Sequence, residues 1–375
     1  MEENKQNQEE RIEELSQKLF GKPSKDIKYL LCTNYIHHQL LEEECTRTGL
    51  YQWLNVFKGQ VKYPRDVLDY NEYDIVQVNL SAQDLFLVNE IRESLNEGSK
   101  TKLVANNDYT TEMWGRSFEY TPTFCREVQG ADMLFGTEYF QATALTELSG
   151  RKCYVIPHPA DVKRLKAITP IPKQSIISTI WRRYDQHSYI PSLVVRNHGL
   201  TTQLIGYDKG LDFKPYLTTT LYDFVYQGTN YFDFCNQLRE SQIVYDPFTY
   251  HSYSRTTVDT AALGVAVVGS NRTQSINVCY PHTAVDPYDV KTARELIKKL
   301  IEDKEFYNLV VETAKQNVEF YNHQNSRERY LFALLEAIET DHRKQIKLKR
   351  PLVKGIGEDI LTNRETPLNQ MRPKI

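Results

Sequence analysis

The sequence predicts an α/β protein with two Rossmann-like, doubly wound domains that face each other across a cleft. Two observations support this prediction. Short apolar runs alternate with amphipathic stretches, which is typical of strand–helix–strand crossover units and parallel sheets. The alternation then starts again after a Pro-containing connection at residues 164–174. With 375 residues, the chain is long enough for two domains of ordinary size.

The first series of elements follows a charged N-terminal segment. Residues 4–19 are expected to form a helix, because Ile12, Leu15 and Leu19 fall along one stripe. A second helix, ending in glycine, is expected at residues 85–98. Strands are predicted at residues 27–33, 73–80, 101–108, 131–137 and 152–159.

The second series begins after the connection. Strands are predicted at residues 175–181, 201–207, 222–228, 241–247 and 265–270, and helical spacing appears early in residues 292–321. The tail from Asp341 holds nine Lys or Arg against four Asp or Glu. The chain therefore divides into a charged helix, a first domain, a second domain and a basic tail, at residues 1–24, 25–168, 169–340 and 341–375.

A hydroxyl-rich loop runs directly into an apolar segment at Ser254–Gly264. Ser and Thr are good N-caps, and glycine is common just past a helix end, so a short helix is expected here. A helix start that carries Arg255 and free hydroxyls is also a ready anion site. The simpler interpretation is a helix cap beside an exposed arginine.

Composition excludes several classes of protein. The net charge of −3 gives no overall attraction to nucleic acid or anionic membrane. Six scattered cysteines without a C-x-x-C pair, together with a polar, acidic N-terminus, predict a soluble cytoplasmic protein rather than a secreted or zinc-binding one. The chain contains no G-x-G-x-x-G, P-loop, G-x-S-x-G or H-E-x-x-H motif. No bound cofactor or metal is expected.

Two longer stretches carry a family resemblance. "ADMLFGTEYFQATALTELSGRKCYVIPHPADV" looks like the end of the N-terminal domain of the GT-B nucleotide-sugar glycosyltransferases, and residues 223–270 look like their donor-binding core. Within that fold, the order of segments resembles the large retaining group typified by glycogen and sucrose synthases. The resemblance implies an acceptor domain followed by a donor domain, with a nucleotide-diphosphate sugar, most simply a UDP-sugar, as donor substrate.

The donor motifs of this family are altered here. Its Glu-x7-Glu pair becomes His251 and Asp259, and its Arg and Lys positions become Arg182 and His187. The resemblance implies that the acidic residue, Asp259, holds the ribose. His251 departs from the family pattern, and its imidazole can donate to phosphate or sugar. Arg183 and Arg255 are further cations for the diphosphate. The expected donor-binding residues are Arg182, Arg183, His187, Ser254, Arg255, Thr256, Thr257 and Asp259.

On the acceptor side, the strand at residues 101–108 ends in Asn106-Asn107-Asp108. A carboxylate at that point could deprotonate an acceptor hydroxyl in an inverting reaction or orient the sugar in a retaining one. It is equally suited to a turn. Enzymes of this fold mostly work without metal, because cationic side chains and a helix start stabilise the leaving diphosphate. Asp108 and His251 are the predicted catalytic residues.

The sequence thus predicts a glycosyltransferase that acts on a hydroxyl acceptor. A saccharide is the broad expectation. A hydroxymethylated pyrimidine in phage-type DNA is a specific alternative, which the altered motif and the basic tail favour and the net charge opposes. Loss of two Glu and one Lys also leaves open a GT-B binding protein without catalysis. A sugar-nucleotide epimerase is a third possibility.

Overall fold

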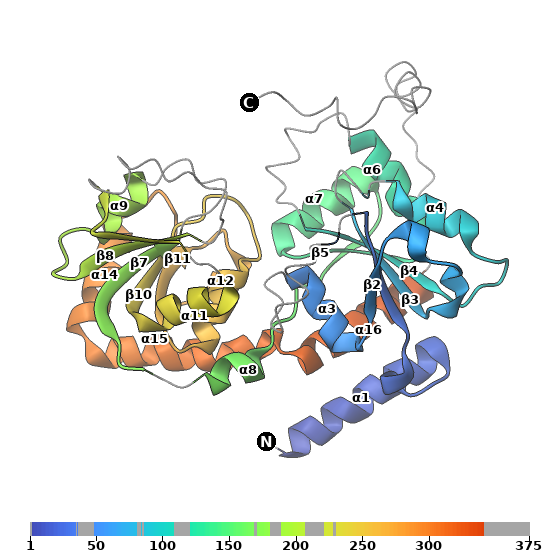
Figure 1. Cartoon of the computed structure of the whole chain (residues 1–375), viewed down its shortest axis with the longest axis horizontal. Coiled ribbons are helices and arrows are strands. Elements are labelled where there is room, and N and C mark those ends of the chain that lie inside the picture. The colour runs from blue at the N-terminus through green and yellow to red at the C-terminus, as the bar shows by residue number, and fades with distance from the viewer. Residues whose placement is uncertain are drawn as a thin grey trace.

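In the computed structural model the chain forms two parallel sheets of six strands each, with helices packed on both (Figure 1). The structure describes residues 2–34, 36, 49–80, 84, 86–108, 121–168, 171–180, 189–206, 221–227 and 230–340. Arg182, Arg183, His187 and the basic tail lie outside the described residues.

The first sheet has the strand order β2-β1-β3-β4-β5-β6. All its neighbouring strands are parallel, and Cys32 at the end of β1 pairs with Val78 of β3. The order reverses between β1 and β3, which makes that point the topological switch of a doubly wound sheet. The strands are β1 (Tyr29–Cys32), β2 (Gln60–Lys62), β3 (Ile75–Asn79), β4 (Lys102–Asn107), β5 (Met133–Gly136) and β6 (Cys153–Val155).

The second sheet has the order β12-β11-β10-β7-β8-β9, with its switch point between β7 and β10. It is parallel throughout. Its strands are β7 (Gln174–Ile180), β8 (Thr201–Gly206), β9 (Phe224–Gln227), β10 (Ser241–Asp246), β11 (Ala266–Ser270) and β12 (Ala284–Val285). The predicted fold class, two doubly wound parallel domains, is confirmed.

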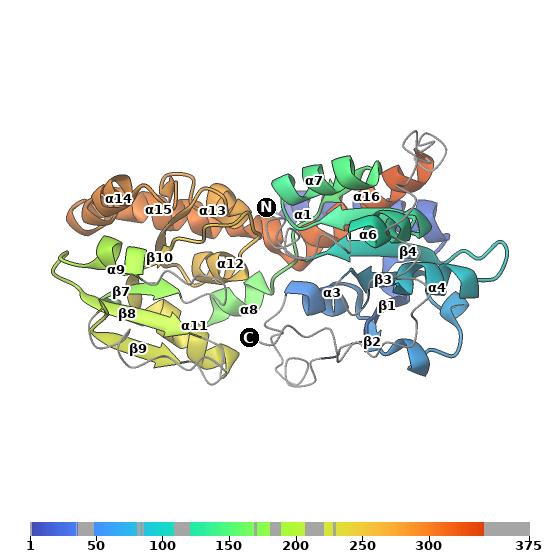
Figure 2. The ribbon, with the colours of Figure 1, turned by 90° about the horizontal axis from the view of Figure 1, so that it is seen from above.

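Helices cover both faces of each sheet (Figure 2). The α-helices are α1 (Glu2–Phe20), α3 (Gly49–Phe57), α4 (Leu87–Ser94), α6 (Thr121–Glu127), α7 (Tyr139–Ser149), α8 (Val162–Ala167), α9 (Tyr189–Val195), α11 (Tyr231–Glu240), α12 (Arg255–Ala262), α13 (Gln274–Cys279), α14 (Val290–Glu302), α15 (Lys304–Asn317) and α16 (His323–Glu339). Short 3₁₀ helices are η1 (Ser24–Asp26), η2 (Pro64–Asp66), η3 (Tyr70–Glu72), η5 (Val128–Gly130) and η6 (Val318–Tyr321).

Residues 292–321, where the sequence showed helical spacing in the early part, lie in α14, α15 and η6. Asp303 separates the first two, because its extended backbone ends α14 and its side chain accepts a hydrogen bond from the Phe306 N–H at 2.9 Å. That contact is a typical N-cap. Most of the other predicted strands and helices appear within a few residues of their expected bounds.

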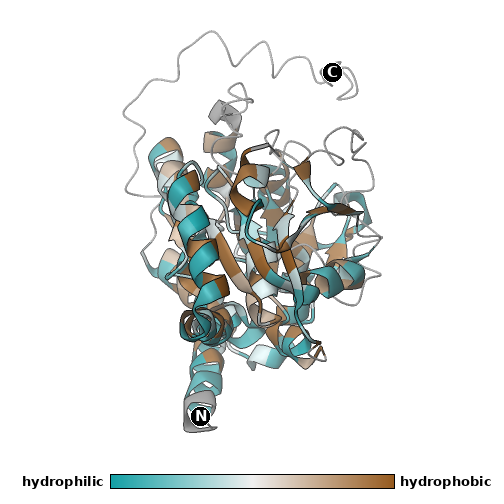
Figure 3. Cartoon of the chain, turned by 90° about the vertical axis from the view of Figure 1, so that its left-hand side faces the viewer, coloured by the Kyte–Doolittle hydropathy of each residue, from teal (hydrophilic) through white to brown (hydrophobic). Residues whose placement is uncertain are grey.

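Three apolar clusters form the cores of the two domains. One cluster fills the second domain, and the other two lie on the faces of the first sheet. Brown residues gather on the strands and on the helix faces that cover them, whereas teal residues lie on the outer faces of the helices (Figure 3). Ile12 of α1 is buried in the first domain, where its helix packs on α16, so the predicted N-terminal stripe joins a core.

The first domain is not contiguous in sequence. Tyr330 and Leu334 of α16 pack with Trp53 in the first domain, although the sequence prediction placed residues 169–340 in the second. Val162 and Leu165 of α8 lie in the second core, although residues 25–168 were placed in the first. The polypeptide therefore crosses between the sheets twice (Figure 1). Helix periodicity shows which face of α16 is apolar but not which sheet that face covers.

The two crossings lie side by side, since the Ala160 N–H donates to the Tyr321 carbonyl oxygen at 2.8 Å. None of the helices among the described residues has the length and apolar character needed to cross a membrane.

Candidate functional site

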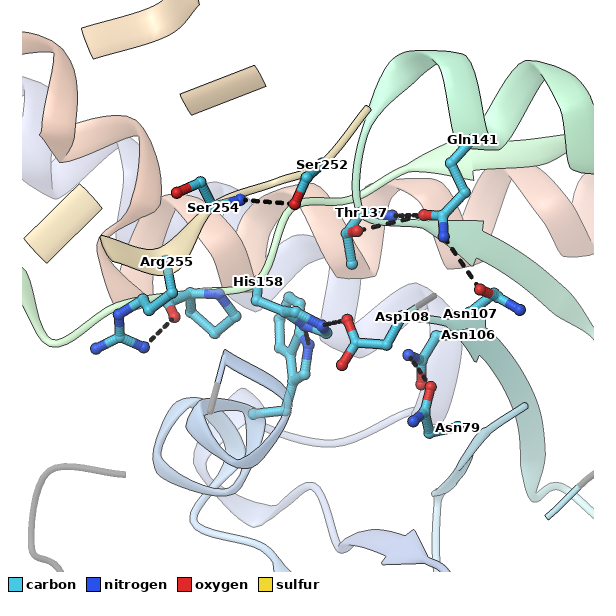
Figure 4. Close-up of polar contacts among 12 residues, drawn as sticks. Asn79, Asn106, Asn107, Asp108, Thr137, Gln141, His158, Ser252, Ser254 and Arg255 are labelled. Atoms are coloured by element: carbon cyan, nitrogen blue, oxygen red, sulfur yellow. Dashed lines mark hydrogen bonds and ion pairs between the residues drawn. The ribbon is translucent and has the colours of Figure 1, made fainter. Parts of the chain in front are cut away.

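The carboxyl edges of the two sheets approach each other. Phe140, which follows β5 in the first domain, stacks on His251, which follows β10 in the second. Their ring centroids are 4.1 Å apart and their planes differ by 19°. Ligands of doubly wound sheets bind outside the carboxyl ends of the strands. The residues between these two edges therefore define the candidate site, part of which is drawn in Figure 4.

Asp108 directly follows β4 and reaches the region between the domains (Figure 4). Its side chain is 34% exposed, and its Oδ1 lies 2.5 Å from Nε2 of His158, whose side chain is only 3% exposed. Because one oxygen is held by a buried ring and the carboxylate still reaches solvent, Asp108 combines a fixed orientation with access to a ligand.

The ring nitrogen of His158 that does not face Asp108 is also hydrogen-bonded. Its Nδ1 accepts a hydrogen bond from the indole Nε1–H of Trp53 in α3 at 3.0 Å. A Cβ added at Gly49, the first residue of α3, would lie 2.5 Å from the His158 Cβ, so only glycine fits there. Trp53 is fully buried. The three side chains thus form a continuous hydrogen-bonded chain from the core of the first domain to Asp108.

Buried amides form a second chain along the same edge. The hydroxyl groups of Tyr29 and Tyr330 donate to Oε1 of Gln77 at 2.8 and 3.1 Å. Nε2 of Gln77 donates to Oδ1 of Asn106 at 2.9 Å, and Nδ2 of Asn106 donates to Oδ1 of Asn79 at 3.0 Å. Each link fixes the orientation of the next amide, which directs the amino group of Asn79 away from Asn106.

Asn107 belongs to a separate network that reaches β5. Gln141 of α7 donates to Oδ1 of Asn107 at 3.0 Å and accepts from the Thr137 N–H at 2.8 Å. Glu138 caps α7 by accepting from the backbone N–H groups of Phe140 and Gln141. The start of α7 is therefore satisfied by the chain's own carboxylate.

The start of α12 differs from the start of α7. Ser254 occupies the N-cap position with a positive φ of 52°, and its side chain makes no capping hydrogen bond. Its Oγ donates instead to Oδ2 of Asp246 at 3.1 Å, and Oγ1 of Thr257 donates to the same oxygen at 3.0 Å. The expected capping by Ser254 is thus not made, because the buried carboxylate at the end of β10 takes its hydroxyl. The Ser254 side chain therefore does not accept a hydrogen bond from the first-turn N–H groups of α12, which an acceptor from a ligand could supply.

Arg255 and Asp259 form a buried pair on α12. Nε of Arg255 lies 2.6 Å from Oδ1 of Asp259, and the two side chains are 11% and 2% exposed. The guanidinium also donates to the Tyr231 hydroxyl at 3.3 Å and to the Pro159 carbonyl oxygen at 3.4 Å. In this arrangement, contact between Asp259 and a ribose requires Arg255 to release the carboxylate. The ribose-binding role of Asp259 stays a prediction.

Burial dominates the electrostatics of this pair. Desolvation raises the pKa of Asp259 above its ordinary value, although the charge and hydrogen bond of Arg255 act against that rise. Desolvation lowers the pKa of Arg255, but Asp259 and the neighbouring tyrosines outweigh it and the pKa rises further. Arg255 therefore stays a permanent cation at the junction of the two domains.

The remaining predicted site residues fall into two groups. His251 lies at the junction through its contact with Phe140, and Thr256 is partly exposed in the first turn of α12. Arg182, Arg183 and His187 are outside the described residues, and their diphosphate-binding role stays a prediction. Within the described part of the chain, no three His, Cys, Asp or Glu side chains gather in a way that suits a metal ion.

His158 and Trp53 are the site residues that sequence reasoning missed. His158 lies within the quoted "VIPHPADV" segment, near the end of the strand predicted at residues 152–159, and that position was its only signal. The pairing of Arg255 with Asp259 was readable from their spacing of four residues on a helix. Trp53 gave no signal, because it belongs to a helix that the sequence did not predict.

Comparison with solved structures places this fold among the GT-B glycosyltransferases. A UDP-forming α,α-trehalose-phosphate synthase from Burkholderia xenovorans matches with a TM-score of 0.56 and 12% identity over 71% of this chain and 74% of that one. HepE from Anabaena, in complex with UDP and glucose, matches with a TM-score of 0.60 and 12% identity over 83% and 100%.

A trehalose-6-phosphate synthase that carries out glycosyltransfer with retention matches with a TM-score of 0.56 and 13% identity over 70% and 73%. No family model and no curated protein sequence matches the chain. At these identities the similarity establishes the fold, and the glycogen- and sucrose-synthase-like subgroup stays a prediction.

Proposed function

We propose that the protein is a glycosyltransferase that moves a sugar from a nucleotide-diphosphate sugar, most simply a UDP-sugar, to a hydroxyl acceptor. The observation that carries this proposal is the pairing of two features across the domain junction. A partly exposed carboxylate, Asp108, stands on the first edge. A helix start whose N-cap side chain is engaged elsewhere stands on the second.

The helix start suits the diphosphate of the donor. First-turn N–H groups of α12 point out of the helix, and the dipole there is equivalent to about half a positive charge, worth roughly 0.3–2 kcal/mol depending on burial. Arg255 adds a fixed charge on the same turn. Arg182, Arg183 and His187 are further predicted contacts of the diphosphate, and we propose His251 and Thr256 as additional ones.

The reaction breaks one bond and forms another. The bond from the anomeric carbon to the diphosphate oxygen breaks, and its electron pair leaves with the nucleoside diphosphate. The acceptor oxygen forms the new bond to that carbon and loses its proton. If Asp108 accepts the proton, the sugar is inverted. If the leaving phosphate accepts it, Asp108 orients the sugar, and retention results.

Retention is favoured by the likeness to a trehalose-6-phosphate synthase that works with retention, and the altered His251 and Asp259 positions weaken that preference. The acceptor is proposed to be a saccharide hydroxyl, because the uncharged amide of Asn79 lies at the end of β3, next to the strand that leads to Asp108. A hydroxymethylated pyrimidine in DNA is the alternative acceptor. The sequence gives it the basic tail as its main support.

A binding protein without catalysis is the second candidate function. The buried ion pair between Arg255 and Asp259 favours it, because the residue expected to hold the ribose is engaged by the protein itself. Such a protein would bind a nucleotide sugar and leave it intact.

Incubation with a panel of nucleotide sugars separates these candidates. The transferase is expected to release nucleoside diphosphate slowly without acceptor and faster with saccharide acceptors or with DNA that contains a hydroxymethylated pyrimidine. Asp69→Asn is a suitable control, because Asp69 is exposed and precedes β3 at the opposite edge of the sheet. Nucleotide binding with no release from any donor would support the binding protein instead.

A further inference from the structure

Trp53, His158 and Asp108 form a chain whose directions are fixed by chemistry. An indole N–H can only donate a hydrogen bond, so Nδ1 of His158 must be the acceptor from Trp53. The hydrogen of the neutral imidazole must then sit on Nε2, which faces the Asp108 carboxylate.

From this geometry we propose that His158 is a positioning residue that holds Asp108 for the reaction, and that Trp53 keeps His158 in its neutral Nε2–H form. The proposal rests on the proposed function, because it assigns a purpose to the orientation of Asp108. It concerns residues that neither the sequence motifs nor the structural comparisons single out.

The neutral state follows from what surrounds the ring. A protonated imidazole donates from both nitrogens, so its Nδ1–H would point at the Trp53 N–H and the hydrogen bond between them would be lost. Asp108 faces Nε2 of the ring, and the Tyr253 ring lies 5.8 Å from the imidazole.

A neutral donor serves Asp108 better than a cation would. The hydrogen bond from His158 occupies Oδ1 and leaves Oδ2 for an acceptor hydroxyl or the donor sugar. A full positive charge at that distance would make the neighbouring carboxylate a weaker base. The ring is also kept from turning by Trp53 behind it, Gly49 against its Cβ and Tyr253 against its edge. The carboxylate is therefore held in one orientation.

Nitrogen NMR of the full-length protein tests the tautomer without any substrate. In the wild type at neutral pH, Nε2 of His158 should carry the hydrogen and Nδ1 should carry none, because Nδ1 accepts from Trp53. In Trp53→Phe the donor to Nδ1 is gone, and a measurable share of the molecules should carry the hydrogen on Nδ1. A wild-type His158 that carries a hydrogen on Nδ1 overturns the proposal.

Turnover tests the purpose of this arrangement. Relative to wild type, Trp53→Phe should lose on the order of tenfold in turnover number, with the KM for the nucleotide sugar little changed. His158→Gln keeps an amide N–H near the Nε2 position and should show a lower turnover. Adding Trp53→Phe to His158→Gln should lower turnover little further, because the residue that Trp53 positions is already replaced.

Phe57→Leu is the matched control, because it weakens the same aromatic cluster without touching the hydrogen-bonded chain. An equal fall in turnover in both Trp53→Phe and Phe57→Leu would mean that Trp53 acts only through packing, and would overturn the proposal. If the wild type turns over no nucleotide sugar, the proposed function fails, while the NMR measurement still decides whether Trp53 fixes the tautomer.

Discussion

The carboxyl edges of the two sheets differ in what shapes them: side-chain hydrogen bonds on the first sheet and backbone geometry on the second. On the first sheet, hydrogen bonds between side chains fix the orientation of the site. Gln77, Asn106 and Asn79 orient one another. Trp53 orients His158, which in turn holds Asp108. On the second sheet, the notable feature is the backbone at the start of α12. Ser254 has a strained φ of 52°, its hydroxyl donates to Asp246, and its side chain makes no capping hydrogen bond at the start of α12. Strain of this kind costs about 1–3 kcal/mol and persists only where the surroundings enforce it.

This contrast suggests a division of work. A reacting hydroxyl needs one group in one orientation, which a buried side-chain network supplies. A diphosphate needs several donors in an arc, which a helix start supplies. The comparison therefore predicts that changes on the first edge alter turnover and that changes on the second alter nucleotide affinity.

The largest expected effect separates these two roles at Asp108. Asp108→Asn should lower the turnover number by about 10²–10⁴-fold, the range usual for a positioned acid or base. Nucleotide affinity, measured by titration calorimetry, should stay close to that of the wild type. A variant with wild-type turnover would make Asp108 a structural residue and end the proposed division.

The next largest effect concerns the buried pair on α12. Asp259→Ala leaves Arg255 charged and unpaired in a buried site, and breaking such a pair typically costs about 3–5 kcal/mol of stability. Urea unfolding measures this loss. Nucleotide affinity of the folded variant should also fall, by roughly 10- to 150-fold if a charge-assisted hydrogen bond to the ribose is lost.

A double variant distinguishes these two contributions. Arg255→Met with Asp259→Leu removes both charges and should recover most of the stability, because replacing a buried ion pair by apolar side chains is often neutral or favourable. Affinity should remain low in the double variant, because Arg255 and Asp259 are both proposed contacts of the donor. Recovery of both stability and affinity would show that neither side chain contacts the donor.

A smaller effect is expected where the two edges touch. Phe140→Ala removes the stack on His251, and aromatic pairs contribute about 0.5–1.5 kcal/mol beyond their buried area. The domains should separate more readily, which small-angle scattering would register as a larger radius of gyration. Leu148→Ala, an exposed position on the same helix, is the control. Identical scattering from Phe140→Ala and wild type would mean that the stack does not hold the edges together.

The smallest expected effect on stability concerns His323, at the start of α16, where the chain crosses back to the first domain. Nε2 of His323 contacts Oε1 of Gln52 at 2.9 Å, and burial lowers the pKa of His323 below 6.5. Below about pH 6.5 the unfolded chain binds a proton at His323 more readily than the folded protein does. The free energy of unfolding should therefore fall as the pH drops through this range, by about 1.4 kcal/mol per unit of pKa depression.

His323→Gln should reduce this pH dependence and keep a polar contact with Gln52. Urea unfolding at about pH 7.5 and about pH 5.5 measures the difference. The same pH dependence in variant and wild type would exclude His323 as its source.

The sequence predicted the sheets better than it predicted their boundaries. Strands buried on both faces, such as residues 75–79 and 266–270, appear as continuous apolar runs and are easily recognised. The three-residue β2 and the two-residue β12 are too short to carry a pattern. The return of α16 to the first domain was unreadable, because an amphipathic stripe does not say which surface it covers.

Some residues of the site could also be predicted from the sequence, and others could not. Asp108 was recognisable because polar residues follow a buried strand, and the helix start because hydroxyls precede an apolar run. His158 lies 50 residues from Asp108 and 105 from Trp53 along the chain, so only the fold brings the three together. Likewise, Ser254 is a good N-cap by composition, and only the structure shows that Asp246 takes its hydroxyl.

The position of α16 has a consequence for how the protein is made. The second sheet is built from one continuous stretch, so its core can close as soon as that stretch has left the ribosome. The first domain, although its strands are synthesised earlier, must wait for Tyr330 and Leu334 to cover Trp53. Until then an apolar surface stays open on the nascent chain, the kind of surface that makes folding intermediates prone to aggregation. The half of the protein that is translated first is thus the half that finishes folding last.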